Sequence, residues 1–157
     1  LNRRFYAIKQ LWYKHHEYVK YGHSVDFINS RYDPVVNFTK FKLEPIINLP
    51  ENKKVPVVFV LHGCLQNAET VSEQTGWNKL ADQHGFIVVY PQQKYTNNTS
   101  GCFNWFRKKD ITKGSGEVHS IKEMIDYTNK NFNTDSTEVF VTGLAAGAAM
   151  AVAPPCG

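Results

Sequence analysis

Three short, largely apolar runs separated by two helical stretches are the feature that most restricts how this chain folds. Residues 55–61 are continuously apolar, as a strand buried on both faces requires, and similar runs follow at 86–90 and 138–142. Between them, residues 69–84 and 117–132 repeat apolar side chains at helical spacing. This alternation of strands and helices predicts an α/β fold with a doubly wound, mostly parallel sheet.

The sequence divides into a peripheral amino-terminal segment, residues 1–54, and an α/β core, residues 55–157. In the peripheral segment we expect a helix over about 4–19 and one or two outer strands within 35–47. In the core, residues 92–116 form a long polar stretch with an aromatic island. Loops of this length in a compact domain are often functional.

Composition excludes several classes of function. The 157 residues are 42% hydrophobic and 20% charged, which is typical of one globular domain with a sizeable core. The net charge of +4 is small beside the basic patches of nucleic-acid-binding proteins, so we expect no nucleic-acid partner. No apolar stretch approaches the roughly 20 residues that cross a bilayer, so we expect no transmembrane segment. The three cysteines lack metal-ligand spacing, and we expect neither a metal nor a cofactor.

The third apolar run leads into a turn of unusual composition. Residues 139–150 read Val-Phe-Val-Thr-Gly-Leu-Ala-Ala-Gly-Ala-Ala-Met, a strand, a glycine-flanked turn and the start of an alanine-rich helix. This is the spacing of the G-x-S-x-G nucleophile elbow, whose turn lifts the central side chain above the sheet. The central residue here is Ala145, which has no oxygen with which to attack. The residues therefore predict the geometry of a serine hydrolase without its nucleophile.

The loop after the first run, His62-Gly63-Cys64, is a candidate for the second half of the same site. A glycine directly after a buried strand lets the backbone turn sharply and expose N–H groups. An oxyanion hole takes one N–H from this loop and one from the residue after the nucleophile, which by position are Cys64 and Ala146. Alone, Gly63 fits an ordinary turn at a strand end. The elbow downstream favours the functional interpretation.

Many separate blocks between residues 55 and 150 resemble the polyhydroxybutyrate depolymerase-like esterases, a family that includes feruloyl and acetylxylan esterases. The blocks are residues 61–64, 66–68, 75–78, 81–82, 85–86, 89–92, 102–106, 114, 116–117, 120–121, 124–126 and 141–144. The resemblance implies an α/β-hydrolase fold and a Ser-His-Asp triad acting on a carboxylic ester. Against the family's elbow, Gly-Leu-Ser-Ala-Gly-Gly-Ala-Met, this chain has Ala145 for the serine and Ala148 for a glycine, a methyl where helix and strand pack closely.

The resemblance also implies that the chain is the amino-terminal part of such an esterase. A family member continues after the elbow with strands that carry the aspartate and histidine, whereas Ala-Pro-Pro-Cys-Gly at 153–157 breaks the helix. We therefore expect a sheet truncated after the elbow, with an open edge through which the chain can self-associate. We do not expect His119 and Asp126 to replace the absent triad members.

Candidate substrate contacts in this resemblance are His62, Asn104 and Trp105. An aromatic ring on a long loop at the strand ends offers a flat surface to an acyl or aryl group, but Trp105 fits equally well as a plug that holds the loop on the core. Cys64 and Cys102 fit a disulfide bracing the oxyanion loop if their Cα atoms lie roughly 4.4–6.8 Å apart.

The function implied by the resemblance is hydrolysis of polyester or short-chain carboxylic esters by a serine esterase, with a polyester, acyl or feruloyl ester as partner. We expect this chain to be inactive, because Ala145 replaces the nucleophile. The alternative is a pseudoenzyme that binds esters or carbohydrates without turnover. The resemblance favours an extracellular, secreted protein, with a cytoplasmic one as the alternative.

Overall fold

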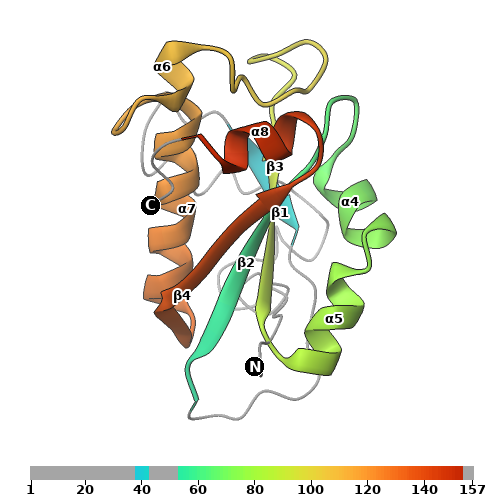
Figure 1. Ribbon diagram of the computed structural model, residues 1–157, viewed down its shortest axis with the longest axis vertical. Helices are drawn as coiled ribbons and strands as arrows, with labels where there is room; N and C mark the ends of the chain where they lie inside the picture. Colours follow the sequence, from blue (N-terminus) through green and yellow to red (C-terminus); the bar gives the residue numbers. More distant parts are fainter. Residues whose placement is uncertain (1–37, 43–52, 154–157) are drawn as a thin grey trace, which may run out of the picture.

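The computed structural model describes residues 38–42 and 53–153 (Figure 1). The expected helix at 4–19 and most of the peripheral segment 1–54 lie outside the described residues. The elements, in chain order, are β1 (Phe38–Lys42), β2 (Val55–Leu61), α4 (Ala68–Gln74), α5 (Trp77–His84), β3 (Ile87–Gln93), α6 (Lys108–Ile111), α7 (Gly116–Asn131), β4 (Thr134–Gly143) and α8 (Ala146–Ala151). Within the two described ranges, no helix has the length and apolarity that a bilayer crossing needs.

The described strands form one sheet in the order β1-β3-β2-β4. The central strand β2 is parallel to both of its neighbours, with Val57 opposite Ile87 in β3 and Val58 opposite Phe140 in β4. The outer strand β1 runs antiparallel to β3. The prediction of an α/β fold with a mostly parallel sheet is therefore confirmed.

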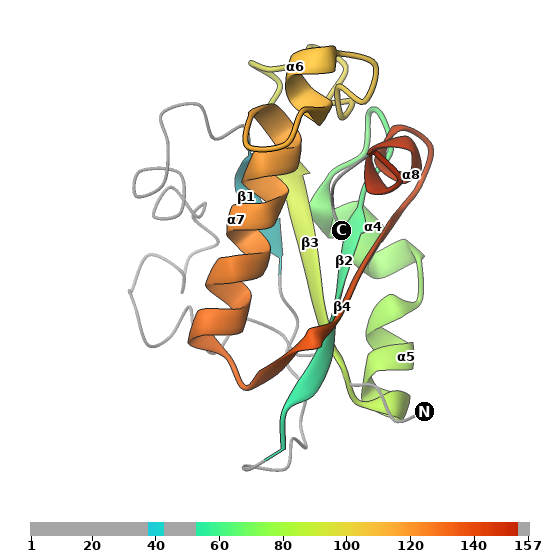
Figure 2. The ribbon, with the colours of Figure 1, turned by 60° about the vertical axis from the view of Figure 1, so that its left-hand side comes forward.

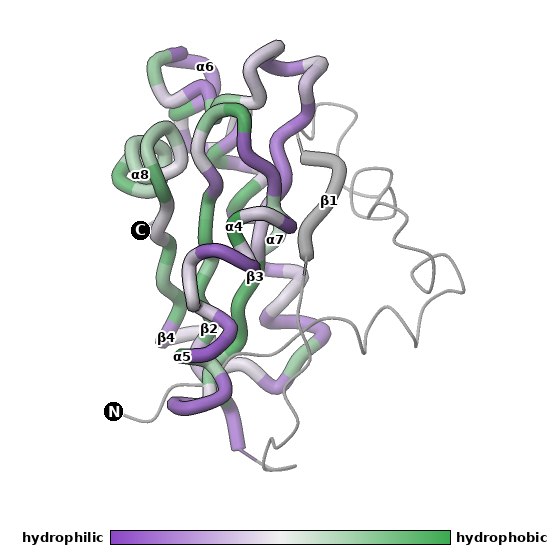
Figure 3. Tube along the Cα trace, turned by 90° about the vertical axis from the view of Figure 1, so that its right-hand side faces the viewer, coloured by the Kyte–Doolittle hydropathy of each residue, from purple (hydrophilic) through white to green (hydrophobic). Residues whose placement is uncertain are grey.

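Helices cover both faces of the sheet, with α7 on one side and α4 and α5 on the other (Figure 2). Because side chains of a strand alternate between faces, β2 contributes to both cores. Its residues at 55, 57, 59 and 61 join the cluster under α7 and Met150, and those at 58 and 60 join the cluster under α4 and α5. Figure 3 shows the hydrophobic colouring concentrated along these central strands. A strand buried on both faces explains why its sequence is continuously apolar.

Three element boundaries differ from the sequence prediction. The helix expected over 69–84 is two helices, because Gly76 adopts a left-handed conformation with φ of 69°. The strand expected at 86–90 continues through Pro91 to Gln93, where it pairs with β1 after its pairing with β2 has ended. The strand β4 begins at Thr134 rather than at residue 138.

The parallel strands place their carboxyl ends at one end of the molecule. The loop after β2, the long loop after β3 and the turn after β4 all start there, and α6 and α8 lie at this same end (Figures 1 and 2). In open α/β sheets this is where ligands bind. The candidate site is built from these three connections.

Candidate active site

The turn between β4 and α8 holds Ala145 in a strained conformation. Its φ of 49° and ψ of −115° are adopted routinely by glycine alone, and such backbone strain costs on the order of 1–3 kcal/mol. The turn is fixed from below, since the Leu144 N–H donates to the Leu61 carbonyl at 3.0 Å and the Gly147 N–H donates to the Leu144 carbonyl at 2.8 Å. The Ala145 side chain is exposed above the sheet. The strand, strained residue and helix expected of an elbow are all present.

Close packing explains the glycines on either side of Ala145. A Cβ added to Gly143 would lie 2.5 Å from the carbonyl carbon of Gly147, and a Cβ added to Gly147 would collide with the Leu61 carbonyl oxygen. The closest approach of helix and strand therefore falls at Gly147. Ala148, where we expected a crowded methyl, is half-buried at the next position of α8.

The oxyanion loop, residues 62–67, lies directly against the elbow. The ideal Cβ position of Gly63 is 3.6 Å from the Cβ of Ala145. The loop is closed by a bond from the Gly63 N–H to Gln66 Oε1 at 2.8 Å, and it is fixed from outside by the Leu65 N–H, which donates to the Ser100 carbonyl at 2.8 Å. Leu65 is the second residue with positive φ, at 60°, among the described residues other than glycine.

The two N–H groups assigned to an oxyanion hole are not used by the described part of the protein. Neither the Cys64 nor the Ala146 amide has a hydrogen-bond partner within residues 38–42 and 53–153. Ala146 is the first residue of α8, where backbone N–H groups lack an intrahelical acceptor and the helix dipole favours negative charge. Within the described ranges, both groups are therefore available to donate to an oxygen of a bound molecule.

A disulfide joins the oxyanion loop to the long loop after β3. Cys64 and Cys102 are bonded, with their Cα atoms 4.2 Å apart, just below the expected range, and with a sequence separation of 38. The sequence left this pairing open, because it does not give the Cα separation. The bond and the contact between Leu65 and Ser100 attach the oxyanion loop to the same neighbouring segment.

His62 supports the loop from inside. Its side chain has no exposed surface, its Nδ1 lies 2.7 Å from the Gly63 carbonyl, and its Nε2 accepts the Gln93 N–H at 3.1 Å. Its ring lies 4.9 Å from that of Phe103. Burial lowers the pKa of His62, more than the carbonyl of Gly63 raises it, which favours the neutral ring with a proton on Nδ1. With both nitrogens engaged and no surface exposed, the ring connects β2 to β3 and presents nothing to a ligand.

The two other expected substrate contacts differ in exposure. Asn104 is 1% exposed and is held by hydrogen bonds to Glu117 in α7, so it offers little surface to a ligand. Trp105 is 47% exposed and packs edge-to-face on Phe106 at 5.9 Å. Of the three candidates, Trp105 is the one with an apolar face available at the strand ends.

Glu117 is a buried carboxyl group beside this site; the sequence counted it among the residues that resemble the family but gave it no role. Its Oε1 accepts Asn104 Nδ2 and Gln93 Nε2, each at 2.6 Å, and its Oε2 accepts the Asn104 N–H at 2.8 Å. Burial raises the pKa of Glu117, the three donated hydrogen bonds lower it, and the nearby Asp110 raises it. By its position in the sequence, Glu117 is an acidic residue in the first turn of a helix, a common preference that carries no sign of burial.

Asp110 in α6 is a second buried carboxyl group next to the start of α7. Burial raises its pKa, while the charges of Lys109 and Arg107 and a hydrogen bond from the Glu117 N–H lower it. Its Oδ2 has no hydrogen-bond partner within the described ranges. Asp110 therefore helps to cap α7, because the first N–H groups of a helix need an external acceptor.

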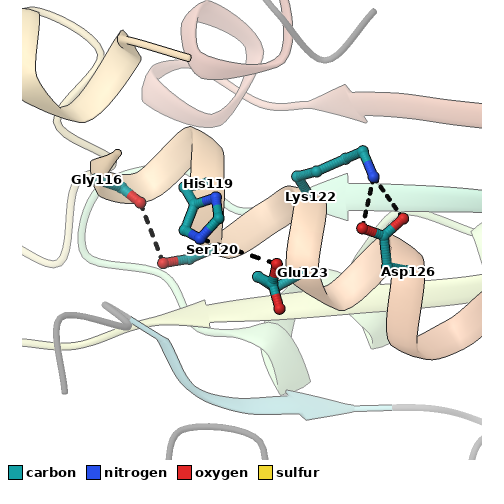
Figure 4. Close-up of polar contacts among 6 residues, drawn as sticks. All are labelled: Gly116, His119, Ser120, Lys122, Glu123 and Asp126. Carbon is teal, nitrogen blue, oxygen red and sulfur yellow. Dashed lines mark hydrogen bonds and ion pairs between the residues drawn. The ribbon is translucent and has the colours of Figure 1, made fainter. Parts of the chain in front are cut away.

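The ionisable residues considered for an alternative triad on α7 are paired along the helix instead (Figure 4). His119 Nε2 lies 3.8 Å from Glu123 Oε1, and Lys122 pairs with Asp126, both at the i, i+4 spacing of helix neighbours. His119 and Asp126 therefore have separate partners. In the described part of the chain, no group of three or more His, Cys, Asp or Glu residues is placed to hold a metal ion.

Comparison with known proteins identifies the family. The family model described as "Esterase PHB depolymerase" matches residues 43–154. The chain belongs to this esterase family. The resemblance found in the sequence is thus confirmed, and the elbow and oxyanion loop lie within the matched region.

Two curated relatives match over 95 residues, or 60% of the chain. Poly(3-hydroxyalkanoate) depolymerase C of Paucimonas lemoignei is 52% identical there, and acetylxylan esterase A of Aspergillus oryzae is 35% identical. The matched region spans 23% and 30% of the length of these relatives, respectively.

Solved structures give the same result for the fold. An acetyl xylan esterase from Aspergillus awamori aligns with a TM-score of 0.64 at 30% identity, covering 73% of this chain and 40% of the other. The serine hydrolase FphF of Staphylococcus aureus aligns with a TM-score of 0.51 at 18% identity, covering 73% of this chain and 45% of the other, and supports the fold alone.

Proposed function

We propose that this chain forms the elbow and oxyanion half of a carboxylic-ester site, in a protein whose family activity is hydrolysis of polyester or short-chain esters. The observation that carries the proposal is the strained backbone of Ala145 beside the unpaired N–H groups of Cys64 and Ala146. In an acyl-transfer site these two groups hold the ester oxygen as negative charge develops on it. Strained residues of this kind cluster at functional sites, which favours a functional role for this turn over that of an ordinary surface turn.

The chain as it stands binds an ester without cleaving it. Ala145 offers a methyl group where a serine oxygen would attack the carbonyl carbon, and removal of a triad nucleophile typically costs several orders of magnitude in turnover. The second candidate function follows from the same residue. A protein that naturally has alanine here is a pseudoenzyme that keeps an ester or carbohydrate pocket and uses it for binding.

The relatives' names support a carboxylic ester as the shared ligand chemistry. They describe a depolymerase of poly(3-hydroxyalkanoate) and an esterase of acetylxylan. The exposed ring of Trp105 supplies an apolar surface for the acyl or aryl part of such an ester. The Cys64–Cys102 bond supports an extracellular location, since disulfides persist in oxidising compartments and are rare in the cytosol.

The test is the exchange Ala145→Ser in the longest natural reading frame that contains this chain. We expect the native protein to leave p-nitrophenyl butyrate and hydroxybutyrate oligomers uncleaved. The serine variant should hydrolyse them at least about a thousandfold faster than the native protein, because an oriented nucleophile then joins the oxyanion donors. Release of p-nitrophenol, followed in a spectrophotometer, measures both rates.

The matched control is Ala149→Ser, which adds the same hydroxyl to α8 outside the elbow and should leave the rate at its native value. Hydrolysis by the native protein would contradict the predicted inactivity. A serine variant that binds hydroxybutyrate oligomers in calorimetry but cleaves nothing would favour the pseudoenzyme. If it neither bound nor cleaved any ester, the proposed function would be wrong.

A further inference from the structure

We propose that Glu117 is a positioning residue of the ester site, which holds the loop between Gln93 and Asn104 and thereby sets both Trp105 and the oxyanion loop. The effect on ligand binding rests on the proposed function. The effect on the loop does not depend on it.

The carboxylate of Glu117 accepts its hydrogen bonds from residues outside its own helix. The side chain has no exposed surface, and all three of its hydrogen-bond donors belong to the end of β3 and the loop that follows. Gln93 lies at the start of this loop and Asn104 at its end, so one carboxylate joins the two ends. Bonds between a carboxylate and N–H groups are about twice as strong as bonds between neutral groups.

Gln93 and Asn104, the two partners of Glu117, make further hydrogen bonds to residues inside the loop. Gln93 Nε2 also donates to the Cys102 carbonyl at 3.1 Å, and Gln93 Oε1 accepts from Asn97 Nδ2 at 2.9 Å. Asn104 Oδ1 accepts from Asn98 Nδ2 at 2.9 Å. Each of the two residues held by Glu117 therefore fixes a residue in the interior of the loop.

The loop in turn reaches the proposed ester site at two places. Cys102 is bonded to Cys64, whose N–H is one proposed oxyanion donor, and the Ser100 carbonyl accepts the N–H of Leu65. At the other side, Trp105 directly follows Asn104. Movement of this loop would displace the oxyanion donor and the apolar face together.

The alternative is that the Glu117 side chain only fills space in the core or accepts the first N–H groups of α7. Asp110 already supplies an external acceptor for the Glu117 N–H, so the Glu117 carboxylate is available for the loop. Its three partners are all N–H groups that bond to both of its oxygens, so both side-chain atoms must be acceptors, as they are in a carboxylate. A glutamine would fill the same volume but would turn an NH₂ group toward these donors.

The test compares Glu117→Gln with Glu123→Gln, a control that removes a carboxylate from the same helix where it pairs only with His119 among the described residues. Hydrogen exchange measured by mass spectrometry should accelerate about tenfold or more in residues 94–105 of the Glu117 variant, as expected for the loss of a charge-assisted bond. Exchange in residues 118–131 should stay at the native rate. The Glu123 variant should leave both segments unchanged.

Calorimetric titration with a hydroxybutyrate trimer gives the binding readout. Glu117→Gln should weaken its affinity about tenfold or more, and Glu117→Asp, which restores the charge, should recover part of it. If Glu117→Gln fails to fold, Gln93→Met removes the first link of the network and should accelerate exchange in the same loop.

Native-like exchange in the loop of a folded Glu117→Gln protein would overturn the proposal. Equal acceleration in the Glu123 variant would also overturn it. If the native protein binds no ester, the proposed function fails, and the exchange measurement alone decides the role of Glu117.

Discussion

At the scale of single residues, Ala145 has a strained backbone conformation, and its exposed methyl group buries little surface that would offset the cost of this strain. The methyl group is exposed and the backbone lies in a region that glycine adopts freely. In the family's own elbow this position carries a serine, whose oxygen the strain presents to the substrate. The chain has kept the strained turn without the oxygen.

Replacement of Ala145 with glycine should therefore stabilise the protein. We expect Ala145→Gly to raise the free energy of unfolding by about 1 kcal/mol, because relief of the strained backbone exceeds the entropy that glycine adds to the unfolded chain. Ala149→Gly, the same exchange inside α8, should lower it by about 1 kcal/mol. Urea denaturation followed by circular dichroism measures both. A change of the same sign in the two variants would contradict the strain argument.

The residues of the site differ in how far the sequence could predict them. Cys64, Ala145 and Ala146 could be proposed from the sequence because their place follows from motif spacing along a buried strand and a turn. The burial of His62 and of Glu117 could not be predicted, because it depends on residues that approach from other strands and loops. Nothing in the local sequence distinguishes these side chains from exposed ones.

At the scale of elements, the central strand was predicted with its observed bounds because burial on both faces leaves a continuous apolar signal. The break between α4 and α5 was missed because apolar periodicity continues across it, and one left-handed glycine at position 76 decides the outcome. The extension of β3 past Pro91 depends on pairing with β1, which periodicity cannot show.

The loop after β3 is an element without regular structure, and we expect its order to depend on the disulfide. Replacement of both Cys64 and Cys102 by serine should lower the free energy of unfolding by on the order of 4 kcal/mol, the chain-entropy value for a loop closed across 38 positions. The serine pair should also accelerate hydrogen exchange at residues 62–66. Denaturation curves with and without dithiothreitol provide the measurement, since the reductant should affect only the native protein.

Cys156→Ser serves as the thiol control, because it removes the third cysteine and leaves the Cys64–Cys102 bond intact. Its unfolding curve should match that of the native chain. A double serine variant as stable as the native protein would show that the disulfide does not hold this loop.

At the scale of the whole molecule, the two sides of the described sheet differ. At one edge of the sheet β3 pairs with the short strand β1. At the other edge β4 pairs with β2 alone among the described strands. The side chains of β4 are mostly partly exposed, unlike those of β2 and β3, which are buried throughout. A strand at the edge of a sheet is a template on which a strand of another chain can pair.

We therefore expect the chain to self-associate through β4, and a charge on this strand to prevent it. Phe140, 38% exposed near the middle of β4, is the residue to change, since lysine on an edge strand opposes pairing with a second copy. Light scattering coupled to size-exclusion chromatography should show concentration-dependent dimers or larger species for the native chain and a monomer for Phe140→Lys. Val152→Lys places the same charge on a more exposed apolar residue, 82% exposed after α8, and should leave association unchanged. A native chain that stays monomeric as its concentration rises would show that this edge is protected, and an equal effect of both lysines would show that net charge rather than β4 controls association.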